Sequence, residues 1–340
     1  MEEEKELLEM IGYLCKRLTD LKWFYSPRYF KESKVSIENI INFRDSGLRL
    51  ILVLDRNIFS RLMDVVTKGK TNQGDTRDIA VLMSFCAILS FDICPYFAIN
   101  EYSAGQDQEL IAQNEFYIFD SIFKNISYNS WLKIAVGAED RLDKIITLPQ
   151  KAFQSISFHE DTTDYLSHYA ALIHFAYVWR TQKDSFEKFK SFFEWYYAHS
   201  KYSRFMVIYI CSVLASCNKY KLPKNINSES FENVVSGCKN QARDISYLSL
   251  LSLDRYPSNQ YEMVLVSSDE MLGDIYSKGV SNSGAIRLYE KSIKKNNKKA
   301  SEWVDHLLTT HQECKRNDEK YYQDLVKVEF LRLKKLFQSP

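Results

Sequence analysis

Two short apolar stretches interrupt an otherwise helical pattern of hydrophobic and polar positions. Residues 48–54 (LRLILVL) and 262–266 (EMVLV) are nearly continuous aliphatic runs, and residues 96–99 (YFAI) form a weaker third run after Pro95. Runs of this length and composition predict β-strands. Because strands without polar alternation are covered on both faces, we expect a mostly parallel sheet with helices above and below it.

Helical periodicity dominates the rest of the chain, which makes the expected fold class α/β. A C-terminal stretch, residues 301–336, predicts one or two long charged helices. Apolar residues recur at spacings of three and four in six further stretches. These stretches are residues 56–66, 76–91, 106–123, 161–179, 186–199 and 231–253.

The length of 340 residues allows a core domain with a substantial insertion. We expect residues 1–125 and 227–285 to form the core around the sheet. The mostly helical and aromatic residues 126–226 are then an insertion, and residues 286–340 a basic helical C-terminal extension.

The charge distribution and the cysteines exclude few classes of protein. The net charge is +1, but from residue 287 onward thirteen Lys or Arg stand against eight Asp or Glu, so this segment carries +5 and the rest −4. Such a segment can contact a phosphate backbone, and a solvated helix face explains it equally well. The seven cysteines include no CxxC pair, which favours reduced thiols over a zinc site.

Nothing in the chain predicts a membrane partner. The N-terminus, MEEEKELLEM, is acidic where a signal peptide is basic. The longest apolar runs, residues 79–91 and 205–215, are shorter than the roughly 18 residues of a membrane-spanning helix. We therefore expect a cytoplasmic protein.

The most informative feature is an acid after each predicted strand. Asp55, Glu101 and Asp269 follow the three runs, and the carboxyl ends of parallel strands meet at one edge of a sheet. Asp244 joins them as a candidate, because in its predicted helix it shares a face with Leu248. The sequence thus predicts a cluster of four carboxylates.

Carboxylates held together repel one another and need protons or a hard cation, for which Mg²⁺ or Mn²⁺ is the natural choice. Such ions support phosphodiester hydrolysis. Each acid also has a structural explanation. Asp55 and Asp269 can be N-caps of the following helices, Glu101 a surface acid, and Asp244 the buried partner of an arginine.

The same segments resemble the PIN-domain nucleases. LILVLDRNIFSRL resembles the family's opening strand, with Asp55 and Asn57 in the positions of the first acid and the small polar residue. INEYSAG resembles the second position and gives Glu101, and NQARDISYLSLL resembles the helix with the third acid, Asp244. VLVSSDEMLGDI resembles the late strand with the fourth acid, Asp269.

The resemblance covers residues 45–122 and 231–285 and implies a Mg²⁺- or Mn²⁺-dependent ribonuclease or DNA nuclease on a sheet of about five parallel strands. It implies that Asn57 and Ser268 orient the acids and that Asp274 is a peripheral ligand. The spacing from Glu101 to Asp244 is longer than in a minimal PIN domain, hence the insertion. Asp92 or Glu109 can replace Glu101 in this assignment.

Two other segments have competing interpretations. Residues 186–205 interleave aromatic and basic residues, which fits either stacking of bases from a single strand or a buried core. In HEDTTDYLSH, His159, Asp161, Asp164 and His168 can form a metal site, although a helix start with a surface pair is the simpler explanation. No nucleophile-elbow or Walker A pattern is present in the sequence.

The leading hypothesis is a metal-dependent nuclease that cleaves RNA or, as the second choice, DNA. Because indiscriminate cleavage is toxic, we expect restraint by a regulatory protein partner or by homo-oligomerisation, as in a toxin or an antiviral defence effector. The alternatives are a non-catalytic PIN-like scaffold and a hydrolase of small phosphoesters.

Overall fold

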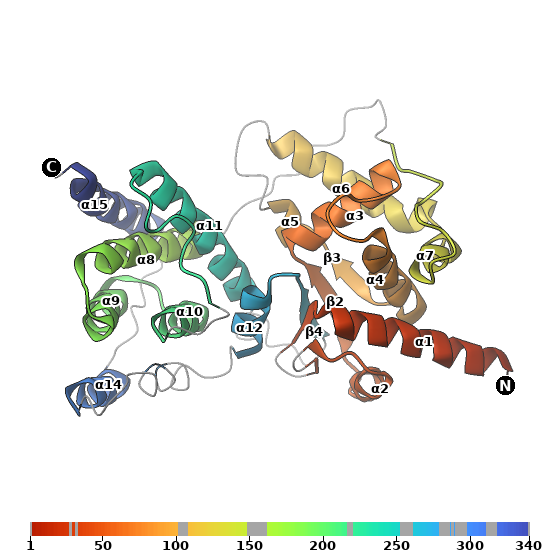
Figure 1. Cartoon of the computed structure of the whole chain (residues 1–340), viewed down its shortest axis with the longest axis horizontal. Helices are drawn as coiled ribbons and strands as arrows, with labels where there is room; N and C mark the ends of the chain where they lie inside the picture. Colours follow the sequence, from red (N-terminus) through yellow and green to blue (C-terminus); the bar gives the residue numbers. More distant parts are fainter. Residues whose placement is uncertain are drawn as a thin grey trace. The chain divides into compact units, whose positions relative to one another are not determined.

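The computed structural model describes residues 2–26, 29–30, 33–100, 108–147, 162–215, 220–251, 261–278, 286, 289, 298–310 and 318–338. The chain forms two compact units (Figure 1), one of Met1–His159 with Pro257–Ser277 and one of Glu160–Tyr256 with Lys278–Pro340. These units differ from the domains expected from the sequence. Residues 126–159 belong to the first unit with the sheet, and residues 227–256 belong to the second, helical unit.

A small mixed sheet organises the first unit. Its strands are β1 (Phe24–Tyr25), β2 (Arg49–Leu54), β3 (Asp92–Cys94) and β4 (Tyr261–Val266), in the order β1-β4-β2-β3. β2 is parallel to both β3 and β4, whereas β1 is antiparallel to β4. The α/β class and the two strongest predicted strands are therefore confirmed. The described sheet has four strands, one of them antiparallel, instead of about five parallel ones.

The prediction of a strand at residues 96–99 was wrong. These residues form helix α5 (Tyr96–Asn100), and the third strand of the parallel set lies earlier, at β3. Pro95 explains the change, because its fixed φ suits the start of a helix, where a backbone N–H has no partner within the helix. The carbonyl of Pro95 accepts the first helical hydrogen bond from the N–H of Ile99, at 3.0 Å.

Helices cover the sheet because the central strands are apolar on both faces. Leu52 and Val264 on one face, and Val53 and Leu265 on the other, are fully buried. Leu52 and Val264 belong to a core that also includes residues of the surrounding helices. Besides α5, the described helices of this unit are α1 (Glu2–Leu21), α2 (Ile37–Asp45), α3 (Arg56–Lys68), α4 (Thr76–Leu89), α6 (Gln108–Asn125), α7 (Tyr128–Ala135) and, after β4, α12 (Glu270–Lys278).

The described part of the second unit is helical. In Figure 1 its helices run from green to blue, and α8 packs against both α11 and α15. The rings of residues 186–205 are mostly core, with Phe189, Phe192 and Tyr196 fully buried, so this segment offers few faces for bases. The helices are α8 (Thr162–Thr181), α9 (Ser185–His199), α10 (Arg204–Leu214), α11 (Phe231–Leu250), α14 (Lys298–Thr310) and α15 (Glu319–Gln338).

The possible metal ligands of residues 159–168 divide between described and undescribed positions. His159 and Asp161 lie outside the described residues. Asp164 forms an ion pair with Lys201 at 2.5 Å, and His168 Nδ1 lies 2.8 Å from the Ser246 hydroxyl. Both described side chains therefore have partners within the helical unit.

None of the described helices is both long enough and apolar enough to span a membrane.

Candidate functional site

Asp55 stands at the carboxyl end of β2, where the strand passes into α3. Its backbone N–H donates to the Val266 carbonyl at 2.9 Å, so the residue continues the ladder between β2 and β4 by one step. Its Oδ1 accepts the N–H of Arg56 at 2.7 Å, which makes Asp55 the N-cap of α3. The capping explanation is thus correct for this oxygen, while Oδ2 has other partners.

Ser267 and Asn57 fix the second oxygen of Asp55. The Ser267 hydroxyl donates to Asp55 Oδ2 at 2.6 Å, and the Asn57 amide donates to the same oxygen. Asn57 Oδ1 in turn accepts the backbone N–H of Ser268 at 3.2 Å, across the two strand ends. Asn57 therefore joins the Asp55 carboxylate to the backbone at the end of β4.

The hydroxyl that orients Asp55 is that of Ser267 rather than that of Ser268, which is solvent-exposed. The register explains the difference. Leu54 is paired with Val266, so the next residues, Asp55 and Ser267, lie at the same level of the two parallel strands. Side chains at one level of a sheet point to the same face. The register identifies Ser267, and the sequence pattern alone carries no signal that separates Ser267 from Ser268.

Asp269 follows β4 and caps α12. Its Oδ1 accepts the N–H groups of Met271 and Leu272 at 2.9 and 3.1 Å, and its own N–H donates to Ser267 Oγ at 2.9 Å. Within the described part of the chain, Asp269 Oδ2 accepts no hydrogen bond. Ser267 thus links the two acids, and the exposed Asp269 keeps one oxygen for a ligand.

No described basic side chain neutralises the negative charges of Asp55 and Asp269. Burial raises the pKa of Asp55, and the negative charge of Asp269 raises it further, against the hydrogen bonds from Ser267, Arg56 and Asn57. The Arg56 guanidinium forms an ion pair with Glu115 at 2.7 Å, and no Lys or Arg among the described residues pairs with either acid. A cation bound between Asp55 and Asp269 would relieve this repulsion.

The other predicted acids have different positions. Glu101 lies outside the described residues, and Asp244 lies on α11 of the second unit, where Gln241 donates to it at 3.4 Å. Asp92, an alternative to Glu101, begins β3 beside Ile51 and pairs with Arg49 at 2.7 Å. It is therefore at the amino end of its strand, opposite to the edge with Asp55.

Two further predicted residues lie on helices. Glu109 is in the first turn of α6, and Asp274 lies on α12 beyond Asp269. Burial raises the pKa of the Tyr25 phenol, and the charges of Glu270, Asp269 and Asp274 add to this effect. Asp274 thus belongs to the acidic environment around Tyr25, on the same helix that Asp269 caps.

The donor set suits a hard cation. Mg²⁺ commonly binds proteins through one or two carboxylates and keeps several waters. Asp55 and Asp269 supply two carboxylates at one sheet edge, with one oxygen of Asp269 accessible. Among the residues that the structure describes, no group of three or more His, Cys, Asp or Glu side chains could hold a metal ion. At this sheet edge the described residues therefore supply two carboxylates and no third His, Cys, Asp or Glu ligand.

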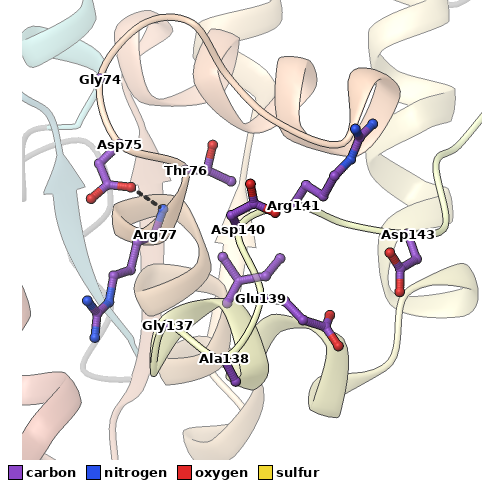
Figure 2. Close-up of a pocket in the computed structure, with 11 residues that line it drawn as sticks. Gly74, Asp75, Thr76, Arg77, Gly137, Ala138, Glu139, Asp140, Arg141 and Asp143 are labelled. Atoms are coloured by element: carbon purple, nitrogen blue, oxygen red, sulfur yellow. Dashed lines mark hydrogen bonds between the residues drawn. The ribbon is translucent and has the colours of Figure 1, made fainter.

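A separate open pocket of about 720 Å³ lies between the start of α4 and the loop after α7 (Figure 2). Asp75 caps α4 there, and the Arg77 guanidinium donates to the carbonyl of Ala135 and the hydroxyl of Tyr13, both at 2.8 Å. Asp75 and Arg77 thus maintain the local structure around this pocket. Its lining includes none of Asp55, Asn57, Ser267 and Asp269.

Comparison with known proteins found no matching family model, no similar curated protein and no similar solved structure.

Proposed function

We propose that this protein is a metal-dependent nuclease that hydrolyses phosphodiester bonds of RNA or, as the second choice, DNA. The observation that supports this best is the Asp55–Ser267–Asp269 arrangement at the carboxyl ends of two adjacent parallel strands. Ligands bind in such a position in open α/β sheets. The PIN-like identity of the first unit is part of the same proposal and rests on the motifs around these residues.

The residues have distinct roles in this proposal. Asp55 and Asp269 hold Mg²⁺ or Mn²⁺, which when bound activates a water molecule and neutralises charge on the phosphate. Ser267 and Asn57 keep the Asp55 carboxylate in one orientation, as groups behind a metal ligand commonly do. The role of Glu101 as a further ligand stays a prediction from the family resemblance, and Asp244, on α11 of the second unit, is not assigned to this edge.

Restraint of such an activity is also proposed. A nuclease without strong substrate selectivity must be controlled inside a cell, so we assign it the role of a toxin or antiviral defence effector with a regulatory protein partner. Harmless strong expression of the chain alone, together with full activity of the purified chain, would contradict this role.

A specific observation favours a second candidate, a non-catalytic scaffold. Asp55 and Asp269 each use an oxygen to cap a helix, so both acids have a structural purpose without a metal. In that case the Asp55 site would bind no divalent cation.

Cleavage of labelled single-stranded RNA and DNA in Mn²⁺, Mg²⁺ or EDTA tests the proposal. The chain should cleave in the presence of metal, and the Asp55→Ala Asp269→Ala variant should be inactive. Asp92→Ala is the matched control, because it removes an acid at the opposite end of the strands and should leave cleavage unchanged. Cleavage that survives the double substitution or EDTA would contradict the proposal. Faster hydrolysis of a small phosphate ester than of any oligonucleotide would identify a phosphatase instead.

A further inference from the structure

Helix α15 of the second unit carries a buried carboxylate in the middle of its apolar face. The buried residues of this helix recur at spacings of three and four and form one face, which consists of Tyr322, Leu325, Glu329 and Leu333. Glu329 is only 1% exposed. An apolar side chain there would pack against α8 without the cost of removing a charge from water, so stability alone does not explain a glutamate at this position.

Three side chains hold the Glu329 carboxylate. His174 Nδ1, on α8, lies 2.8 Å from Glu329 Oε2 and donates to it, because a carboxylate only accepts. The Trp195 indole, on α9, donates to Oε1 at 3.1 Å, and Arg332, one turn further along α15, donates to the same oxygen at 3.0 Å. The His174 ring also stacks on the Trp195 indole, with ring centroids 4.2 Å apart. These four residues, the Glu329 cluster, therefore join α15 to two helices of its own unit.

His174 is the member of the cluster whose charge can change near neutral pH. Two charged groups face its ring, both from α15, together with uncharged groups of α8 and α9. They are Glu329 and Arg332 from α15, Trp195 and the Ser191 backbone from α9, and Tyr177 from α8 itself. Among the described residues, α11 adds no charged group to this environment.

The surroundings of His174 favour its neutral form. Burial lowers the pKa of His174 below its ordinary value and Arg332 lowers it as well, against the raising effects of Glu329 and of the Ser191 backbone. Arg332 Nη1 lies 3.3 Å from His174 Nδ1, so a protonated ring would stand beside a second cation. The Arg332 side chain is 42% exposed and connects the buried cluster to solvent, from which a proton can arrive.

We propose that the Glu329 cluster makes the docking of α15 dependent on pH: the helix is held on α8 and α9 while His174 is neutral, and protonation of the ring favours its release. A histidine kept neutral in the docked state binds a proton more readily once the helix has opened. Docking is therefore strongest above about pH 6.5 and weakens as the pH falls below it. Release uncovers the apolar face of α15, including Leu325 and Leu333. This contact does not depend on the nuclease proposal.

Hydrogen exchange of the α15 amides, residues 319–338, measures the docking equilibrium. The exchange rates are divided by the intrinsic rate at each pH, which gives the opening constant of the helix. Between about pH 7.5 and about pH 5.5 this constant should rise several-fold, and by no more than about tenfold, because one proton is taken up on opening. An opening constant that stays the same over this range would overturn the proposal.

Two histidine variants assign the effect to the cluster. His174→Asn removes the titrating ring but keeps a side-chain N–H for Glu329, so its opening constant should not change with pH. His199→Asn is the matched control, because the exposed His199 also lies beside α15, with its Nδ1 3.5 Å from the Tyr321 hydroxyl. This control should keep the full response of the unmodified chain. A full response in His174→Asn, or its loss in His199→Asn, would refute the assignment.

An NMR titration of the unmodified chain tests the same coupling without relying on a variant that folds. The ring signals of His174, the indole N–H signal of Trp195 and the exchange of the α15 amides should change with one common midpoint. That midpoint should lie below about pH 6.5, the ordinary value for histidine. A His174 ring that titrates while the Trp195 signal and the α15 exchange stay constant would contradict the proposal.

Discussion

The Ser267 hydroxyl is the smallest group whose removal tests the geometry of the candidate site. It is fully buried, donates to Asp55 Oδ2 at 2.6 Å and accepts the backbone N–H of Asp269 at 2.9 Å. Ser267→Ala removes the link between the two acids with almost no change in side-chain volume. The variant should therefore lose the interaction without a cavity.

The expected loss of stability in Ser267→Ala follows from the hydrogen bond between the hydroxyl and the charged Asp55 carboxylate. A hydrogen bond to a charged group contributes about 1.5–3 kcal/mol to stability. For a unit of this size, 1 kcal/mol corresponds to about 2–4 °C in Tm, so Ser267→Ala should lower the Tm by roughly 3–12 °C. The loss should shrink in acid, because the charged carboxylate that the hydroxyl stabilises is then protonated.

Ser268→Ala is the matched control for this substitution. The side chain of Ser268 is exposed, and only its backbone N–H contacts Asn57. The Tm of the Ser268→Ala variant should therefore change by no more than about 2 °C. Thermal unfolding followed by circular dichroism at several pH values measures both variants. Equal effects of Ser267→Ala and Ser268→Ala would refute the assigned network.

Three other substitutions test the electrostatics of the site and the packing of the first unit. Burial raises the pKa of Asp55, so its ionisation lowers stability as pH rises through that pKa. Without metal, the Tm of the unmodified chain should fall relative to that of Asp55→Asn as pH rises through this range, and a Tm difference between the two that does not change with pH would contradict this reasoning. At Gly273 an added Cβ would lie 2.2 Å from the Tyr25 ring, so Gly273→Ala should destabilise by about 1–3 kcal/mol in chemical unfolding. Gly12→Ala, whose Cβ would meet only Ile37 at 3.8 Å, should stabilise by up to about 1 kcal/mol, and the same sign for both glycines would refute the packing argument.

The hydrophobic pattern of the sequence was sufficient to predict the two buried strands. The aliphatic runs 48–54 and 262–266 became β2 and β4, because their residues lie between helices on both faces. The two-residue strand β1 had no such pattern. The run at 96–99 misled because Pro95 suits a helix start as well as a strand boundary, and four apolar residues do not distinguish the two.

The site residues that could be predicted from the sequence are those that directly follow a predicted strand. Asp55 and Asp269 follow β2 and β4 directly, so their common edge could be predicted from a parallel sheet. Ser267 was missed in favour of Ser268 because the choice depends on register, which a sequence pattern does not contain. The wrong strand at 96–99 removed the argument that placed Glu101 at the same edge.

Binding of Mn²⁺ to the purified chain, measured by isothermal titration calorimetry, tests the central claim most directly. The account predicts saturable binding that raises the Tm by several degrees at about 100 times the Kd, and no binding by Asp55→Asn Asp269→Asn. Asp92→Asn, which changes an acid at the opposite sheet edge, should bind as the unmodified chain does. Absence of binding, or equal binding by the double variant, would contradict a metal site at Asp55 and Asp269.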